Sequence, residues 1–197
     1  MIWPEMARVA QQVRDMVTAP RWRHIEGVVA MARELARRFG LDEGQAALAA
    51  LLHDAARDWP ARSLEQAAEA DAGVPPDPVE RSSPELLHGR AAAWWARRHL
   101  GVEDQAVLDA VRYHTTGRPG MGPLEMAVMV ADYGESGRAF DEAASIREAA
   151  ARSLEEACLL SLDVRLRYLL DRGLLIHPRT VEARNWLLAR RGGGRRA

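Results

Sequence analysis

The chain has 197 residues, a formal net charge of -1 and a pI near 6.6, and no lysine among its 27 basic residues. This length suits one domain with a sizeable core, and the near-neutral charge argues against a nucleic-acid-binding role. The sequence has neither an apolar run of the roughly 18 residues typical of a membrane span nor a signal-peptide pattern. With a single cysteine, Cys158, we expect a cytoplasmic protein without disulfides and without membrane or nucleic-acid partners.

The composition favours helices, because alanine, leucine and arginine are abundant while aromatic residues make up only 6%. We expect an all-α fold of about eight to nine helices. Apolar residues at helical spacing predict a first helix over residues 4–17 and a second over 20–40. Asp42, with Gln45 three residues later, is typical of an N-cap, and the helix that follows is expected to continue until Pro60.

Residues 61–83 are expected to hold one short helix and then a surface loop, because the stretch AGVPPDPVERSSP is rich in proline and serine. Capping residues and amphipathic spacing predict the later helices, which cover residues 84–101, 103–115, a segment that begins at Pro123, 141–152, 153–172 and 178–190. The chain is therefore predicted to form one domain over residues 1–190, followed by a disordered Gly/Arg tail over 191–197.

Histidine and aspartate recur beside predicted helix ends or on apolar faces, at His24, His53, Asp54, His88, His114 and Asp132. Any one histidine is more often an ordinary core or surface residue, but these are the ligand types of divalent transition metals. The adjacent His53 and Asp54 cannot share one face of an ideal helix, although both can reach a metal bound beside it. The six residues together predict a metal site.

The order H…HD…H…H…D resembles that of the HD superfamily of metal-dependent phosphohydrolases. More specific segments look like those of the YqeK-type symmetrical bis(5'-nucleosyl)-tetraphosphatases: RWRH, LLHDAAR, LLHG, LDAVRYHTTGRPGM, VADYGESGR and GLLIHPRTVEARN, within residues 21–185. The resemblance implies a single HD domain, a helical bundle. It also implies that a metal-activated water hydrolyses dinucleoside polyphosphates, converting diadenosine tetraphosphate to two ADP.

A binuclear centre of divalent transition metals follows from the same resemblance, with iron expected and manganese or cobalt as substitutes. Its two ligand groups would be bridged by Asp54: His24, His53 and Asp132 for one ion, and His88 and His114 for the other. Two ions lower the pKa of a shared water and stabilise both the attacking and the leaving oxygen. Asp54 and Arg57 are the expected catalytic residues, with Arg57 where the family usually has lysine.

The substrate phosphates are expected to meet basic and hydroxyl side chains, namely Arg21, Arg57, Arg138, Arg147, Thr115 and Thr116. One segment departs from the family. The family usually has the pattern A-D-x-I-E-P-x-R. This chain has ADYGESGR, from Ala131 to Arg138, and so lacks the isoleucine and the proline. The aspartate ligand is kept, but the direction of Arg138 cannot be predicted from this altered helix end.

Other functions fit the same ligands. An HD-type nucleotidase or triphosphohydrolase acting on mononucleotides or guanosine alarmones would share them, because the pocket walls select the substrate. A non-catalytic nucleotide- or metal-binding module is a further alternative, although the complete ligand set argues against it. An apolar outer face on one of the last three helices is also a candidate for a homodimer interface.

Overall fold

The computed structural model describes residues 3–193. Within this range it has eleven α-helices, a short 3₁₀ helix and no strand, which confirms the all-α prediction and exceeds the expected helix count. The elements are Trp3–Met16 (α1), Ala19–Phe39 (α2), Glu43–Leu52 (α3), Ala61–Ala72 (α4), Pro78–Ser82 (α5), Pro84–Leu87 (η1), His88–Leu100 (α6), Gln105–Tyr113 (α7), Pro123–Gly134 (α8), Glu142–Arg152 (α9), Leu154–Asp171 (α10) and Pro178–Gly193 (α11).

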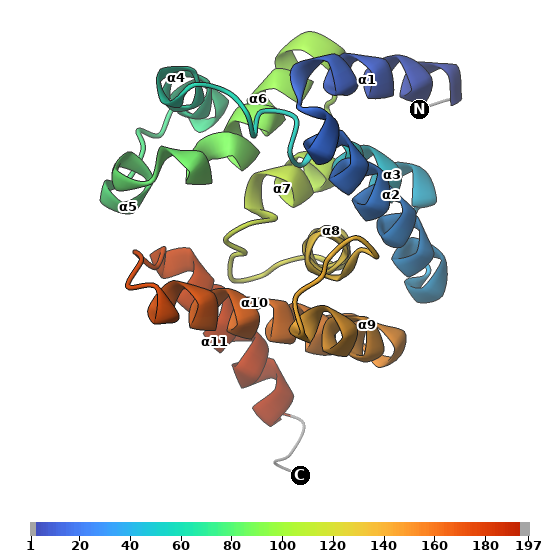
Figure 1. Ribbon diagram of the computed structural model, residues 1–197, viewed down its shortest axis with the longest axis vertical. Helices are drawn as coiled ribbons and strands as arrows, with labels where there is room; N and C mark the ends of the chain where they lie inside the picture. Colours follow the sequence, from blue (N-terminus) through green and yellow to red (C-terminus); the bar gives the residue numbers. More distant parts are fainter. Residues whose placement is uncertain (1–2, 194–197) are drawn as a thin grey trace.

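The central helix is α8, which packs against α2, α3, α7, α9 and α10 (Figure 1). Pro123 starts it, and every residue from Leu124 to Ala131 is buried. A helix that is mostly apolar on all sides removes its apolar surface from water only when other helices surround it. Its burial carries Asp132, the residue that follows the last buried alanine, into the interior of the domain.

The short helix α5 was not expected, because its residues were predicted to be part of a loop. The side chain of Asp77 accepts hydrogen bonds from the backbone N–H groups of Val79 and Glu80, and the Glu80 carboxylate accepts from the Asp77 N–H at 3.0 Å. This capping box satisfies the free N–H groups of a first helical turn. The sequence D-P-V-E thus starts a helix within an otherwise proline-rich segment.

The C-terminal part of the domain consists of α9, α10 and α11, which lie on the far side of α8 from α1 (Figure 1). Helix α11 continues to Gly193, so residues 191–193 of the predicted tail belong to a helix, and residues 194–197 lie outside the described part of the chain. Within the described residues, no helix is long and apolar enough to cross a membrane.

Candidate metal centre

His53 and Asp54 lie just after α3, not within a longer helix, so the prediction that this helix continues to Pro60 was wrong. The backbone after Leu52 makes bonds between residues three apart, such as Ala55 N to Leu52 O at 3.0 Å and Arg57 N to Asp54 O at 2.9 Å. Such bonds tighten the chain. The tighter backbone lets two adjacent side chains serve one site, which a regular α-helix does not allow.

His88 and His114 are brought together by a close contact between α6 and α7. His88 is the first residue of α6, and His114 is the C-cap of α7. A Cβ atom on Gly89 would lie 2.8 Å from the carbonyl oxygen of Arg112 and 2.9 Å from that of Val111. Only glycine permits this approach of the two helices. The glycine of the LLHG segment therefore has a direct role in building the site.

Each of the four histidines has an acceptor at its Nδ1 atom. His53 Nδ1 lies 2.6 Å from the Ala50 carbonyl oxygen and His114 Nδ1 lies 2.8 Å from that of Val111, while His88 Nδ1 faces the carbonyl of Glu85. On α2, His24 Nδ1 faces the Glu135 carboxylate at 3.1 Å. Because a carbonyl or carboxylate only accepts, Nδ1 carries the hydrogen in all four rings, which leaves Nε2 as a possible metal ligand.

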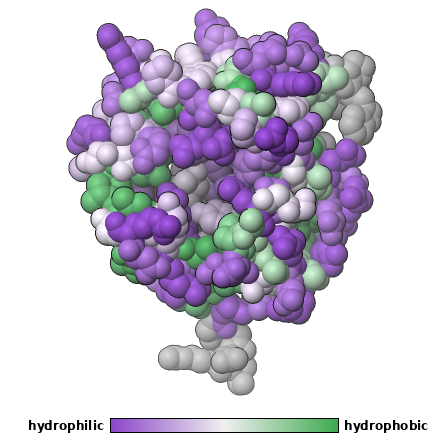
Figure 2. Space-filling model, viewed as in Figure 1, coloured by the Kyte–Doolittle hydropathy of each residue, from purple (hydrophilic) through white to green (hydrophobic). Residues whose placement is uncertain are grey.

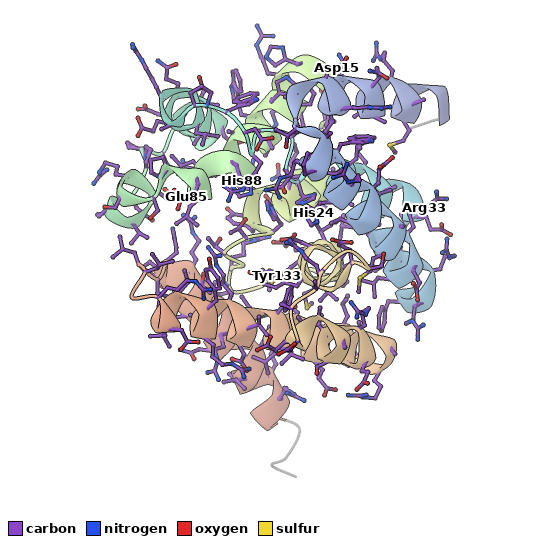
Figure 3. All side chains as sticks on the ribbon, viewed as in Figure 1. Asp15, His24, Arg33, Glu85, His88 and Tyr133 are labelled. Atoms are coloured by element: carbon purple, nitrogen blue, oxygen red, sulfur yellow. The ribbon has the colours of Figure 1, made fainter. Side chains whose placement is uncertain are left out.

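The Nε2 atoms of the four histidines all lie within 3.8 Å of the Asp54 carboxylate, and Figure 3 labels two of these histidines, His24 and His88. His88 Nε2 and His114 Nε2 are 3.0 Å apart, and His24 Nε2 is 3.0 Å from Asp132 Oδ1. His53 Nε2 is buried and has no hydrogen-bond partner among the described residues. Because divalent metals bind imidazole nitrogen at about 2.0–2.1 Å, adjacent ligands of one ion stand about 3 Å apart. The donor set therefore fits a divalent metal.

Asp54 lies between two pairs of histidines. Its Oδ1 atom is 3.1 Å from His88 Nε2 and 3.8 Å from His114 Nε2. Its Oδ2 atom is 3.4 Å from His53 Nε2 and 3.8 Å from His24 Nε2. The carboxylate is 4% exposed, and the two oxygens face different histidines. The structure thus brings together all six predicted ligand side chains, with Asp54 at the centre.

The protonation states of His114, Asp54 and Asp132 suit metal ligation at neutral pH. Burial, together with the nearby His88 and His53, lowers the pKa of His114 to about 3, so this ring is neutral. Burial alone would raise the pKa values of Asp54 and Asp132. For Asp54, the interactions with His53 and His88 prevail and hold its pKa well below its ordinary value. The close contact with His24 and the charge of Arg138 do the same for the pKa of Asp132, so both carboxylates are ionised.

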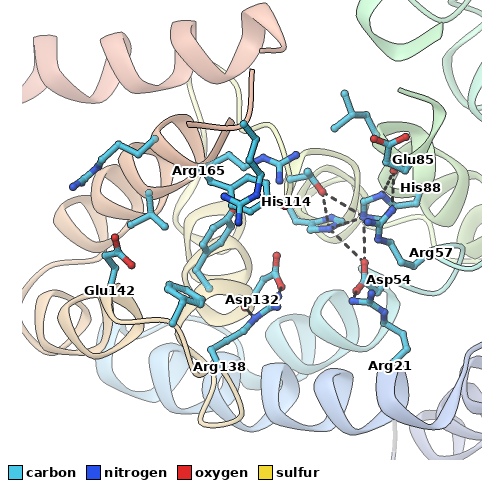
Figure 4. Close-up of a pocket in the computed structure, with 18 of the residues that line it drawn as sticks. Arg21, Asp54, Arg57, Glu85, His88, His114, Asp132, Arg138, Glu142 and Arg165 are labelled. Atoms are coloured by element: carbon cyan, nitrogen blue, oxygen red, sulfur yellow. Dashed lines mark hydrogen bonds and ion pairs between the residues drawn. The ribbon is translucent and has the colours of Figure 1, made fainter. Parts of the chain in front are cut away.

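A cleft of about 620 Å³ opens over these side chains (Figure 4), and Figure 2 shows a hollow in this face bordered by hydrophilic side chains. Four of the residues expected to contact phosphate line the cleft: Arg21, Arg57, Arg138 and Thr115. Arg21 Nη1 donates to Asp54 Oδ2 at 2.7 Å, and Arg138 Nε donates to the Asp132 carbonyl at 2.8 Å. The altered ADYGESGR segment thus still directs Arg138 toward the candidate ligands.

Two residues expected to contact phosphate lie elsewhere. Thr116 is buried and donates to the Gly117 carbonyl at 3.1 Å, and it does not line the cleft. Arg147, on α9, borders a separate pocket and donates to the carbonyl of Gly134, the last residue of α8, at 3.1 Å. A cation is favourable at the C-terminal end of a helix, which accounts for this position of Arg147.

A second group of metal-ligand side chains, Asp77, Glu80 and His177, joins α5 to α11. The backbone N–H of Arg179 donates to His177 Nδ1 at 3.1 Å, so the ring hydrogen is on Nε2, which faces Asp77 Oδ2 at 2.9 Å. Glu80 already accepts from Arg90 at 2.8 Å. These contacts make the group an ionic cluster that holds α11 in place.

Sequence reasoning missed Glu135, the glutamate of the GESGR segment. Its carboxylate is 4% exposed and accepts from His24 Nδ1 and from the backbone N–H of Gly137. On α2, one turn after His24, a Cβ on Gly27 would lie 2.5 Å from Glu135 Oε2. Gly27 therefore makes room for the carboxylate. The sequence gives no local signal of this contact, because Glu135 and His24 are 111 residues apart in the chain.

We expect Glu135→Gln to weaken metal binding by about 10–100-fold, because outer partners of a ligating histidine fix its orientation and increase its basicity. Gly27→Ala should weaken it similarly by displacing the carboxylate. Metal affinity can be measured by competition with a chromogenic chelator. The exposed Glu26→Gln on the same helix is the matched control. Unchanged affinity in Glu135→Gln, with folding intact, would show that His24 does not need this partner.

A family model described as HD domain matches residues 21–161, which is more than half of the chain. The chain therefore belongs to the HD domain family, as the order of its histidines and aspartates had indicated.

Several similar proteins carry the name symmetrical bis(5'-nucleosyl)-tetraphosphatase. The protein from Bacillus subtilis strain 168 is 37% identical over 177 residues, which cover 90% of this chain and 94% of the relative. The protein from Halalkalibacterium halodurans is 34% identical over 186 residues, which cover 92% and 96%. A crystal structure from Clostridium acetobutylicum, described as that of a predicted HD superfamily hydrolase involved in NAD metabolism, matches with a TM-score of 0.89 and 33% identity over 93% of this chain and 97% of the other. These similarities confirm the family and the fold that the sequence motifs predicted.

Proposed function

We propose that the protein hydrolyses dinucleoside polyphosphates symmetrically, converting diadenosine tetraphosphate to two ADP at a binuclear metal centre. The substrate class is supported by the names of the Bacillus subtilis and Halalkalibacterium halodurans relatives, which align with nearly the whole chain. The observation that carries the binuclear proposal is the position of Asp54, whose two carboxylate oxygens face different pairs of histidines. A carboxylate so placed can bridge two ions.

One ion would be held by His24, His53 and Asp132, whose ligand atoms lie within 4.8 Å of one another. The other would be held by His88 and His114, and Asp54 would bridge the two. Bound divalent metals supply a water of lowered pKa and stabilise charge on phosphate oxygens. Mixed imidazole and carboxylate ligands suit iron, manganese or cobalt, and iron is the metal that we propose.

The chain's own residues would orient the substrate. Arg21 and Arg57 line the cleft beside Asp54, and Arg138 lines it beside Asp132. Guanidinium groups bind phosphate oxygens through two parallel hydrogen bonds and compensate the negative charge that develops on a leaving diphosphate. The hydroxyl of Thr115, 2.9 Å from His114 Nε2, is placed to donate to a phosphate near the metal.

The proposal is tested by product analysis. Metal-loaded protein incubated with diadenosine tetraphosphate should yield ADP as the only nucleotide, resolved by ion-exchange chromatography. Removing the metal with a chelator should abolish turnover, and adding back iron, manganese or cobalt should restore it. Production of AMP and ATP would exclude symmetrical cleavage. Hydrolysis of mononucleotides or guanosine alarmones, with the dinucleotide left intact, would indicate the related nucleotidase activity instead.

Two further features stay predictions. A cytoplasmic location fits Cys158, a buried free thiol, and nucleotide substrates of this class. A homodimer would need an apolar surface, and exposed apolar side chains occur on α10, α11 and the turn between them: Leu170, Leu174, Leu175, Val181 and Leu188. Light scattering on purified protein measures the oligomeric state directly.

A further inference from the structure

The cleft extends well beyond the candidate metal ligands and reaches α10. One broad face of this helix lines the cleft, and it consists of Val164, Arg165, Arg167, Tyr168, Asp171 and Arg172. Residues three and four positions apart lie on the same side of a helix, so this face is continuous along nearly two turns. We call it the α10 wall. None of its residues is part of the predicted metal or phosphate site.

The cations of the α10 wall differ from those beside the metal ligands. Arg21 and Arg138 form ion pairs with Asp54 and Asp132. In contrast, among the residues that the structure describes, Arg165 and Arg172 form no ion pair with a carboxylate. Their charges are available to a ligand, and a wall with free guanidinium groups suits an anion such as a phosphate.

The α10 wall also carries an aromatic ring. Tyr168 is 45% exposed, and the guanidinium of Arg172 lies 4.0 Å from its ring centroid. The ring is therefore open to contact from a ligand in the cleft. Nucleobases stack on exposed tyrosine rings and on guanidinium planes. The combination of a free arginine, a tyrosine and a stacked arginine suits a nucleotide.

The two ends of the cleft are chemically distinct. Figure 4 shows Arg57 and Glu85 on one side of the ligands and Arg165 and Glu142 on the other. When a dinucleoside tetraphosphate is cleaved at the centre of its phosphate chain, one nucleoside diphosphate lies on each side of the metal centre. One half would lie toward Arg21 and Arg57, and the other would extend along α10.

We propose that the α10 wall is the subsite for the second nucleotide of the substrate, with Arg165 and Arg172 on its phosphates and Tyr168 stacked on its base. This inference rests on the proposed function. A mononucleotide fills only one side of the cleft, whereas a dinucleotide gains the contacts of both. The wall therefore favours dinucleoside polyphosphates over mononucleotides without any change in the metal ligands.

Binding of a non-hydrolysable analogue tests the wall without turnover. The probe is diadenosine tetraphosphate with a methylene group in place of the central bridging oxygen, titrated calorimetrically into metal-loaded protein. Tyr168→Ala and the double variant Arg165→Ala/Arg172→Ala should each weaken its binding by about tenfold or more. Tyr168→Phe should retain binding, because it keeps the stacking ring. Arg62→Ala, an exposed arginine on α4, is the matched control.

ADP serves as the comparison ligand. We expect ADP to occupy the Arg21 and Arg57 side, so its affinity should change less than about threefold in the wall variants. Unchanged affinity for the analogue would overturn the inference, and so would an equal loss for ADP. Metal content and unfolding temperature are measured for each variant, and wild-type values of both exclude a general loss of structure. If the wild-type protein cleaves diadenosine tetraphosphate but the wall variants bind the analogue normally, only this inference fails; absence of that cleavage would instead refute the proposed function.

Discussion

Replacing Asp54 by asparagine is expected to lower kcat on diadenosine tetraphosphate by about a thousandfold or more, with loss of bound metal. Asparagine keeps the size of the side chain but exchanges one ligand oxygen for an N–H donor, which cannot bind a cation. Because each carboxylate oxygen faces a different pair of histidines, either orientation of the amide removes one ligand contact. Steady-state kinetics and elemental analysis of the purified variant measure both effects.

The matched control is Asp58→Asn, in the same segment after α3. Asp58 is exposed and accepts the backbone N–H of Thr18 at 3.0 Å, so its substitution should leave kcat within about twofold of wild type. If Asp54→Asn kept wild-type kcat and full metal content, the bridging role would be refuted. If the variant bound only one metal ion and had no turnover, the result would support the role of Asp54 as a bridge between two ions, because its loss would leave one of the two metal positions empty.

The local helix signals were largely readable from the sequence. Asp42 caps α3 as predicted, accepting the Gln45 N–H at 2.7 Å, and Gly40 ends α2 with a positive φ of 67°. These signals act over a few residues, so one short segment of sequence is enough to predict where a helix begins or ends. The end of α3 was missed because residues 53–59, HDAARDW, include neither glycine nor proline, the strong helix breakers.

The six ligand candidates were found because a family pattern relates distant residues. Contacts that the family pattern does not describe could not be predicted from the sequence. Glu135 reaches His24 across 111 residues, and Gly89 depends on backbone carbonyls of α7. The α10 wall was missed for a similar reason, since arginine is spread along most helices and sequence alone does not show which of them face a cleft.

The largest effect on stability is expected at Arg90, far from the chemistry. Arg90 is 5% exposed on α6, and it donates to Glu80 Oε2 at 2.8 Å, to the Ala68 carbonyl at 2.9 Å and to the Val74 carbonyl. Glu80 is 3% exposed and also caps α5. Removing Arg90 would leave the buried Glu80 carboxylate with only a longer ion-pair contact to Arg179, at 3.7 Å, and a poorly compensated charge is costly in a medium of low dielectric constant.

Arg90→Met is therefore expected to lower the free energy of unfolding by about 3–5 kcal/mol, measured by urea denaturation followed by circular dichroism. Arg98→Met, an exposed position on the same helix, should change it by less than about 0.5 kcal/mol. The double variant Arg90→Met/Glu80→Gln should be less unstable than the sum of the single variants, because the neutral glutamine leaves no uncompensated charge in the interior. Additive losses would mean that the carbonyl contacts of Arg90, and not its pairing with Glu80, hold α4 and α5 against α6.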